Sequence, residues 1–189
     1  GKTALVTGAS GGLGRAMAEA LAEAGADVAV TSRKRERLDD TVAAIEGLDR
    51  RALPVECDMS DSAAIRALFE TIDREFGRID ILVNNAGTVH RDHPEDFAES
   101  QWRRVVEVNL TAVFLACQEA GRRMLQQGAG KIINIASMLS FTGGIYVPAY
   151  AASKGGVAQL TKALSNEWAA RNVQVNAIAP ITGGGNSAR

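Results

Sequence analysis

The chain has only two cysteines, few aromatic residues and almost no net charge. Cys57 and Cys117 lie far apart, which argues against a disulfide framework and favours two small buried residues in a reducing compartment. A net charge of −1 over 189 residues makes nucleic acid an unexpected main partner. There is no apolar stretch of about 18 residues, no signal-peptide pattern and no lipidation motif. The default prediction is therefore a soluble cytoplasmic protein with no membrane partner.

Apolar residues make up 46% of the chain, enough for one sizeable core. They form strand-like runs at 3–7, 27–31, 51–56, 80–84, 131–136 and 173–179. Helical patterns lie between these runs, near 14–24, 36–46, 61–76, 101–126 and 150–170. Several strand runs are almost continuously apolar, as in a parallel sheet with both faces covered. The sequence thus predicts a single-domain α/β fold, a doubly wound parallel sheet in a Rossmann-like three-layer αβα arrangement, with ligands beyond the carboxyl ends of the strands.

A glycine-rich turn follows the first predicted strand. Gly8, Gly12 and Gly14 have the spacing G-x3-G-x-G, which is neither the G-x-G-x-x-G fingerprint nor an ATP-type P-loop. Glycine lets the backbone approach a phosphate, and the start of the next helix supplies free N–H groups and a partial positive charge. The turn favours a dinucleotide phosphate site, with a tight turn that binds no ligand as the alternative.

The end of the second predicted strand bears on the choice of cofactor. In dinucleotide folds an acid at this place binds the ribose 2′-hydroxyl, whereas a nearby arginine accommodates a 2′-phosphate. Here Ser32 is followed by Arg33. The pair favours NADP(H), with NAD(H) as the alternative. A surface arginine in a solvated loop is the competing interpretation of Arg33.

Only one of the two tyrosines, Tyr150, has a lysine four residues later, at Lys154. Residues at i and i+4 share a helix face, and a positive charge beside a phenol favours the phenolate. A phenol activated in this way can exchange a proton near neutral pH. Ser137 follows the predicted strand 131–136, where its hydroxyl can bond a substrate oxygen. A solvated helix pair and a turn serine are the alternatives.

Together these motifs resemble the short-chain dehydrogenase/reductase family from Lys2 to about Pro180. The turn TGASGGLG at 7–14 matches the family's cofactor turn, and NNAG at 84–87 matches a second motif. The resemblance identifies Asn109, Ser137, Tyr150 and Lys154 as the catalytic tetrad. It implies that Tyr150 exchanges the proton, that Lys154 holds the nicotinamide ribose, and that Asn109 lies at a helix irregularity whose backbone carbonyl positions a relay water.

The resemblance also implies a larger set of cofactor contacts and a substrate class. The expected contacts are Gly8, Ser10, Gly12, Leu13, Gly14, Ser32, Arg33, Asp58, Met59, Asn85, Ala86, Gly87, Tyr150, Lys154 and Pro180. Segments at 134–141, 147–150, 166–168 and 175–180 resemble the sugar-acid branch, which includes 2-deoxygluconate 3-dehydrogenases and gluconate 5-dehydrogenases. We therefore expect an NAD(P)-dependent oxidoreductase acting on a secondary alcohol or ketone such as a sugar acid. A homodimer or homotetramer formed through helices near 111–126 and 151–170 is expected, and no metal.

The chain departs from the family pattern after Pro180. We expect a cofactor-binding and catalytic domain at 1–180 and a short glycine-rich tail at 181–189, apparently without the substrate lid and last strand. A catalytically impaired dinucleotide-binding fragment is the alternative function. A methyltransferase that binds S-adenosylmethionine shares the glycine turn, but it has no use for the serine, tyrosine and lysine together.

Overall fold

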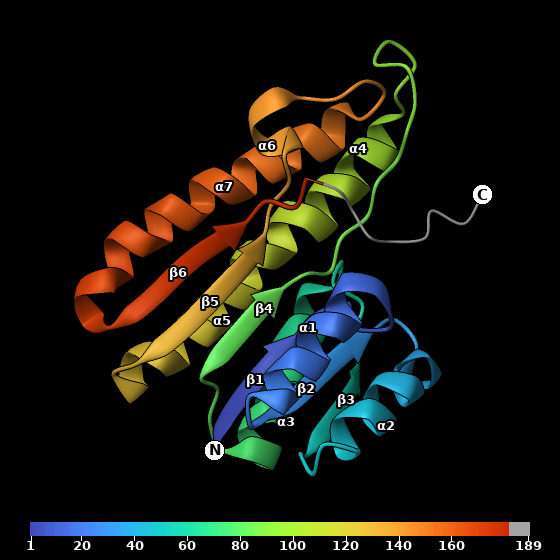
Figure 1. Ribbon diagram of the computed structural model, residues 1–189. Helices are drawn as coiled ribbons and strands as arrows, with labels where there is room; N and C mark the ends of the chain where they lie inside the picture. Colours follow the sequence, from blue (N-terminus) through green and yellow to red (C-terminus); the bar gives the residue numbers. More distant parts are fainter. Residues whose placement is uncertain (182–189) are drawn as a thin grey trace.

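The computed structural model of the chain describes residues 1–181, which contain one parallel sheet of six strands (Figure 1). The strands are β1 (Lys2–Val6), β2 (Ala26–Ser32), β3 (Ala52–Glu56), β4 (Ile81–Asn84), β5 (Gly130–Ile135) and β6 (Val173–Ile178). Their order across the sheet is β3-β2-β1-β4-β5-β6. Every predicted strand is present with ends shifted by no more than one residue, and the doubly wound α/β class is confirmed.

Helices connect the strands and account for most of the remaining described residues. They are α1 (Gly12–Glu23), α2 (Asp39–Glu46), α3 (Ser62–Phe76), α4 (Glu99–Val106), α5 (Ala112–Gln127), α6 (Leu139–Thr142) and α7 (Pro148–Trp168). Short 3₁₀ helices η1 (Arg35–Leu38) and η3 (Ala169–Arg171) precede α2 and follow α7. The predicted helix 101–126 is three elements, because a π-helical turn, η2 (Glu107–Thr111), separates α4 from α5. The short helix α6 was not predicted.

The sheet buries apolar side chains on both faces. In β1, Ala4 and Val6 belong to the cluster that contains α1 and α2, whereas Leu5 points to the cluster that contains α3 and α5. Successive strand residues point to opposite faces, so this alternation divides the core into two layers. Figure 1 shows α1 and α2 in front of the β1–β3 half of the sheet, with α3 behind it. Two covered faces explain why the strands lack polar alternation.

The strand order creates a crevice at the carboxyl edge of the sheet. β1 and β4 are neighbours, but the chain leaves β1 towards β2 and leaves β4 towards β5. The loops after these two strands therefore diverge, which is where open α/β sheets bind ligands. Within residues 1–181 no helix is long and apolar enough to cross a membrane. The tail 181–189, apart from Ile181, and the expected loss of a lid and last strand fall outside the described residues.

Candidate active site

The loops after β1 and β4 are joined by side chains that follow each strand. Thr7 Oγ1 accepts hydrogen bonds from the backbone N–H groups of Asn85 and Ala86, both at 3.0 Å. In return, Asn85 Nδ2 donates to the carbonyl oxygens of Thr7 and Gly8, both at 3.0 Å. Gly8 has φ of +67°, and a Cβ there would lie 2.8 Å from Ala86 Cα. Only glycine permits this close approach of the two loops.

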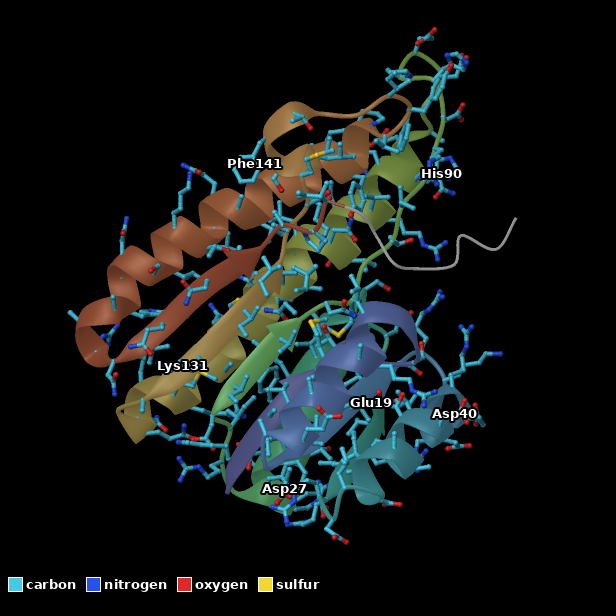
Figure 2. The ribbon with its side chains drawn as sticks, in the orientation of Figure 1. Glu19, Asp27, Asp40, His90, Lys131 and Phe141 are labelled. Atoms are coloured by element: carbon cyan, nitrogen blue, oxygen red, sulfur yellow. The ribbon has the colours of Figure 1, made fainter. Side chains whose placement is uncertain are left out.

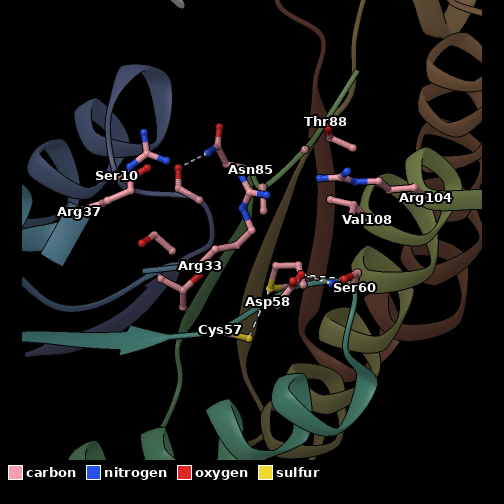
Figure 3. A pocket seen from close by; sticks show the side chains of 16 residues that line it. Ser10, Arg33, Arg37, Cys57, Asp58, Ser60, Asn85, Thr88, Arg104 and Val108 are labelled. Atoms are coloured by element: carbon pink, nitrogen blue, oxygen red, sulfur yellow. Dashed lines mark hydrogen bonds between the residues drawn. The ribbon is translucent and has the colours of Figure 1, made fainter. Parts of the chain in front are cut away.

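Beside these loops lies a cavity of about 400 Å³ (Figure 3). It is bounded by residues at or after the carboxyl ends of β1 to β4 and by two residues of the α4–η2 segment. Nine of the expected cofactor contacts line it: Gly8, Ser10, Ser32, Arg33, Asp58, Met59, Asn85, Ala86 and Gly87. These residues are up to 79 positions apart in the chain, so the sheet brings them together as the sequence motifs predicted.

The cavity carries an excess of positive charge. Figure 3 shows Arg33 and Arg37 on one side and Arg104, which projects from α4, on the other. Within residues 1–181 these three guanidinium groups form no ion pair closer than 4.0 Å. The carboxylate of Asp58 is the cavity's one acidic group, and its hydrogen bonds from Ser60 N–H and Oγ, followed by the fields of Arg33 and Arg104, lower its pKa. An anionic ligand therefore fits this cavity.

A buried hydroxyl in the cavity wall also fits a polar ligand. Thr31, the penultimate residue of β2, is fully buried, and its Oγ1 has no hydrogen-bond partner among the described residues. Thr31 is part of the cavity lining. A buried polar atom left unpaired costs about 1–3 kcal/mol. The residues present thus fit a phosphorylated dinucleotide, through glycine backbone, free arginines and an unpaired hydroxyl.

Sequence reasoning missed several residues of the cavity: Thr31, Arg37, Cys57, Ser60, Thr88, Arg104 and Val108. Arg37 is four residues after Arg33, and that spacing was the available signal. Arg104 and Val108 reach the cavity from the α4–η2 segment, whose position depends on long-range packing that no local pattern reveals.

Six expected contacts do not line the cavity: Tyr150 and Lys154, which belong to the catalytic group described below, and four others. Gly12, Leu13 and Gly14 form the first turn of α1, and Pro180 follows β6. A Cβ on Gly14 would lie 2.3 Å from Gly8 O and 2.6 Å from Asn85 Nδ2. Gly14 therefore allows the start of α1 to pack against the loops that form the cavity, which is a structural requirement for the site.

Lys154 is almost completely buried on α7, with 4% of its surface exposed. Its Nζ donates to the carbonyl oxygen of Ile135 at 2.5 Å and lies 5.8 Å from the centre of the Tyr150 ring. Burial lowers the pKa of Lys154 from 10.5 to about 8. The expected pairing of ammonium and phenol on one helix face is thus present, and it lies where β5 ends.

Asn109 lies inside the π-helical turn η2 and is fully buried. Its Oδ1 accepts from Thr88 N at 2.8 Å, and its Nδ2 donates to Thr88 O at 2.8 Å and to Ser153 Oγ at 3.2 Å. The side chain therefore joins the loop after β4 to α7. A Cβ on Gly87 would lie 3.4 Å from Asn109 Oδ1 and 4.0 Å from Lys154 Nζ, so the cofactor loop and the buried lysine are adjacent. The helix irregularity implied by the family resemblance is present.

Ser137 follows β5 and is half-buried at the start of the segment that forms α6. Its Oγ accepts a hydrogen bond from Leu139 N at 3.2 Å. A hydroxyl has one hydrogen to donate and two lone pairs, so this bond leaves the hydrogen of Ser137 available. Ser137 both caps the turn, as the alternative interpretation proposed, and presents a donor at the carboxyl edge of the sheet.

The structure also describes both cysteines and His90, none of which belongs to the expected tetrad. Cys57 and Cys117 are buried free thiols, and burial raises their pKa values to about 11 and about 12. His90 packs edge-to-face on Phe97, at the same end of the sheet as Phe141 of α6 (Figure 2). Among residues 1–181 no three His, Cys, Asp or Glu side chains gather to hold a metal ion.

The fold and this cavity define a dinucleotide-binding α/β protein, and comparison with known proteins gives its family. Residues 2–184 match the short chain dehydrogenases. A 2-dehydro-3-deoxy-D-gluconate 5-dehydrogenase of Bacillus subtilis is 53% identical, over 95% of this chain and 70% of that protein. A short-chain dehydrogenase/reductase structure from Mycobacterium marinum has a TM-score of 0.91 at 40% identity, covering 95% of this chain and 72% of that one.

A third similar protein, from Agrobacterium tumefaciens, was solved with bound NADP and is provisionally assigned as a 2-deoxy-D-gluconate 3-dehydrogenase. It is 45% identical with a TM-score of 0.87, over 95% of this chain and 71% of that one. The chain belongs to the short-chain dehydrogenase family. The predicted family, its sugar-acid branch and an NAD(P)-dependent oxidoreductase acting on CH–OH groups are therefore confirmed.

Proposed function

We propose that the protein oxidises or reduces a sugar acid at a secondary alcohol or ketone carbon, with a preference for NADP(H). The observation that carries the proposal is the juxtaposition of two sites. The arginine-lined cavity opens beside Gly87, and Gly87 is adjacent to Asn109 and Lys154 of the expected tetrad. A cofactor held in the cavity would thus reach the residues suited to proton exchange.

Each tetrad residue has a separate task in this proposal. The bound cofactor supplies or accepts the hydride. Tyr150 gives a proton to the substrate oxygen during reduction and removes it during oxidation. The free hydrogen of Ser137 orients the same oxygen. Lys154, whose Nζ lies 5.8 Å from the centre of the Tyr150 ring, offers its remaining donors to ribose hydroxyls. Asn109 and its backbone carbonyl support a relay water within η2.

The preference for NADP(H) rests on the charge at the end of β2. Ser32 supplies no carboxylate at the position that binds a ribose 2′-hydroxyl in NAD(H)-dependent folds. Its Oγ is held by Lys34 O at 2.5 Å and Lys34 N at 3.2 Å. Arg33 and Arg37 both line the cavity, and two guanidinium groups suit the doubly charged 2′-phosphate.

The names of similar proteins support a substrate of the sugar-acid class. The Bacillus subtilis relative is a dehydrogenase of 2-dehydro-3-deoxy-D-gluconate, and the Agrobacterium tumefaciens structure is assigned to 2-deoxy-D-gluconate. Arg91 is exposed on the loop after β4, and in this proposal its guanidinium binds the substrate carboxylate. Residues 1–180 act as one catalytic domain in this proposal, in a cytoplasmic homodimer or homotetramer that packs through α5 and α7.

The test is a panel of gluconate-type acids, simple secondary alcohols and acyl thioesters. Turnover of each compound with NADP and with NAD is measured as the change in absorbance of the reduced cofactor. We expect turnover on a sugar acid with NADP. Tyr150→Phe should lower kcat about a hundredfold to ten-thousandfold, with unchanged NADPH binding by fluorescence, because phenylalanine keeps the ring and removes the proton. Turnover of Tyr150→Phe close to the parent would remove the proton-transfer role. Binding of NADPH without turnover on any compound would favour the impaired-fragment alternative.

A further inference from the structure

Lys154 is attached at both ends to the segment that carries Ser137. Its side-chain ammonium donates to Ile135 O, two residues before Ser137. Its backbone carbonyl accepts a hydrogen bond from Ser140 Oγ at 2.7 Å, three residues after Ser137. Two hydrogen bonds therefore link α7 to the segment that carries Ser137, one before the serine and one after it.

Ser140 also holds Ser137 directly. Its Oγ accepts from Ser137 N at 3.2 Å, and its own N–H donates to Ser137 O at 2.9 Å. One hydroxyl thus accepts from Ser137 and donates to Lys154, which uses its single hydrogen and one of its lone pairs. Ser140 is half-buried in α6, a helix of only four residues that packs against α7.

The two links to Lys154 differ in how they respond to a cofactor. In the proposed function the two donors of the ammonium that Ile135 O leaves free turn to ribose hydroxyls, so the ammonium is shared between Ile135 O and the cofactor. The bond from Ser140 involves the backbone of α7 and remains. We infer that Ser140 is a positioning residue, whose hydroxyl sets the separation of Ser137 from Tyr150 during the reaction. This inference rests on the proposed function.

The experiment compares Ser140→Ala, Ser140→Thr and the matched control Thr142→Val. Thr142 lies on the same short helix, and its Oγ1 can donate its one hydrogen to Met138 O or to Gly143 O, both at 3.3 Å, without contacting Ser137 or Lys154. We expect Ser140→Ala to lower kcat about tenfold to a hundredfold, because a small misplacement of catalytic groups has this effect. The KM for NADP and the melting temperature should stay close to the parent. Ser140→Thr keeps a hydroxyl and should restore most of kcat, and Thr142→Val should leave it unchanged.

Amide hydrogen exchange at Ser137 provides a readout that does not need turnover. Removing the acceptor in Ser140→Ala should accelerate exchange at Ser137 N–H about fivefold to tenfold, because the amide loses its hydrogen-bond acceptor, and Thr142→Val should not. If Ser140→Ala exchanges faster at Ser137 N–H but neither the parent nor any variant shows turnover, the proposed function fails and the structural role of Ser140 remains. Parental kcat in Ser140→Ala, or an equal loss in Thr142→Val, would overturn the positioning role, as would unchanged exchange.

Discussion

Lys154→Met tests whether the buried ammonium destabilises the protein in the absence of cofactor. Burial lowers the pKa of Lys154 from 10.5 to about 8 in the folded protein. Between these two values the unfolded chain binds more protons than the folded one, so stability rises with pH in this window. Below pH 8 both states hold the proton, and the full cost of burying the charge is present. Methionine has similar length and no charge, so Lys154→Met removes this dependence.

The size of the effect follows from the two pKa values. Relative to Lys154→Met, the parent should gain about 1 kcal/mol of unfolding free energy between pH 7 and pH 9, and about 2–3 kcal/mol by pH 10. Tyr150, whose ring lies 5.8 Å from Nζ, is replaced by phenylalanine in both proteins, and the remaining titrating groups are shared and cancel in the difference. The loss of the bond to Ile135 O shifts the whole curve of the variant but not its slope.

The assay is urea unfolding of both proteins at pH 7, 8, 9 and 10 without nucleotide, with midpoints converted to free energies. Lys162→Met, which removes an exposed lysine from α7, controls for the loss of a lysine from that helix. A difference between parent and Lys154→Met that stays constant from pH 7 to pH 10 would refute the reasoning, because it would mean that the ammonium is not desolvated in the folded protein.

Two further predictions concern the glycine turn and the arginines. Gly14→Ala should cost about 1–3 kcal/mol of unfolding free energy in urea, because its Cβ would lie 2.3 Å from Gly8 O. Gly11→Ala should cost clearly less, because its Cβ meets nothing within 4 Å. Equal losses in the two variants would contradict the packing argument. Arg33→Glu should lower kcat/KM with NADP about tenfold to a hundredfold and with NAD far less. Arg35→Glu, whose parent side chain pairs with Asp39 at 2.9 Å, is its control, and equal effects on both cofactors would reject a 2′-phosphate contact at Arg33.

The strands could be predicted closely because a sheet covered on both faces needs apolar residues at almost every position. The interruption of helix 101–126 could not be predicted from its pattern alone. Asn109 lies in this turn, and its side chain bonds Thr88 and Ser153 from other elements, which are contacts that a local pattern does not reveal. The family resemblance supplied that irregularity; the residue pattern did not.

The site divides in a similar way. Gly8 and Asn85 belong to loops that follow neighbouring strands, so their meeting was predictable from topology. Arg104 reaches the cavity only because α4 packs beside it. Ser140 had no distinguishing sequence pattern, since α6 is too short to have a period and its hydrogen bonds go to residues 3 and 14 positions away.

The cofactor cavity and the catalytic centre obtain their geometry by different means. The cavity is formed mainly by residues that follow four strands, so its shape depends on sheet register and on glycines that permit close approach. The catalytic centre depends on side-chain hydrogen bonds, since Asn109 joins η2 to α7 and Ser140 joins α6 to α7. A substitution in the glycine turn should therefore act on stability and cofactor binding together. Loss of a hydroxyl at Ser140 should act on the chemical step while binding persists, because the sheet that shapes the cavity is unaffected.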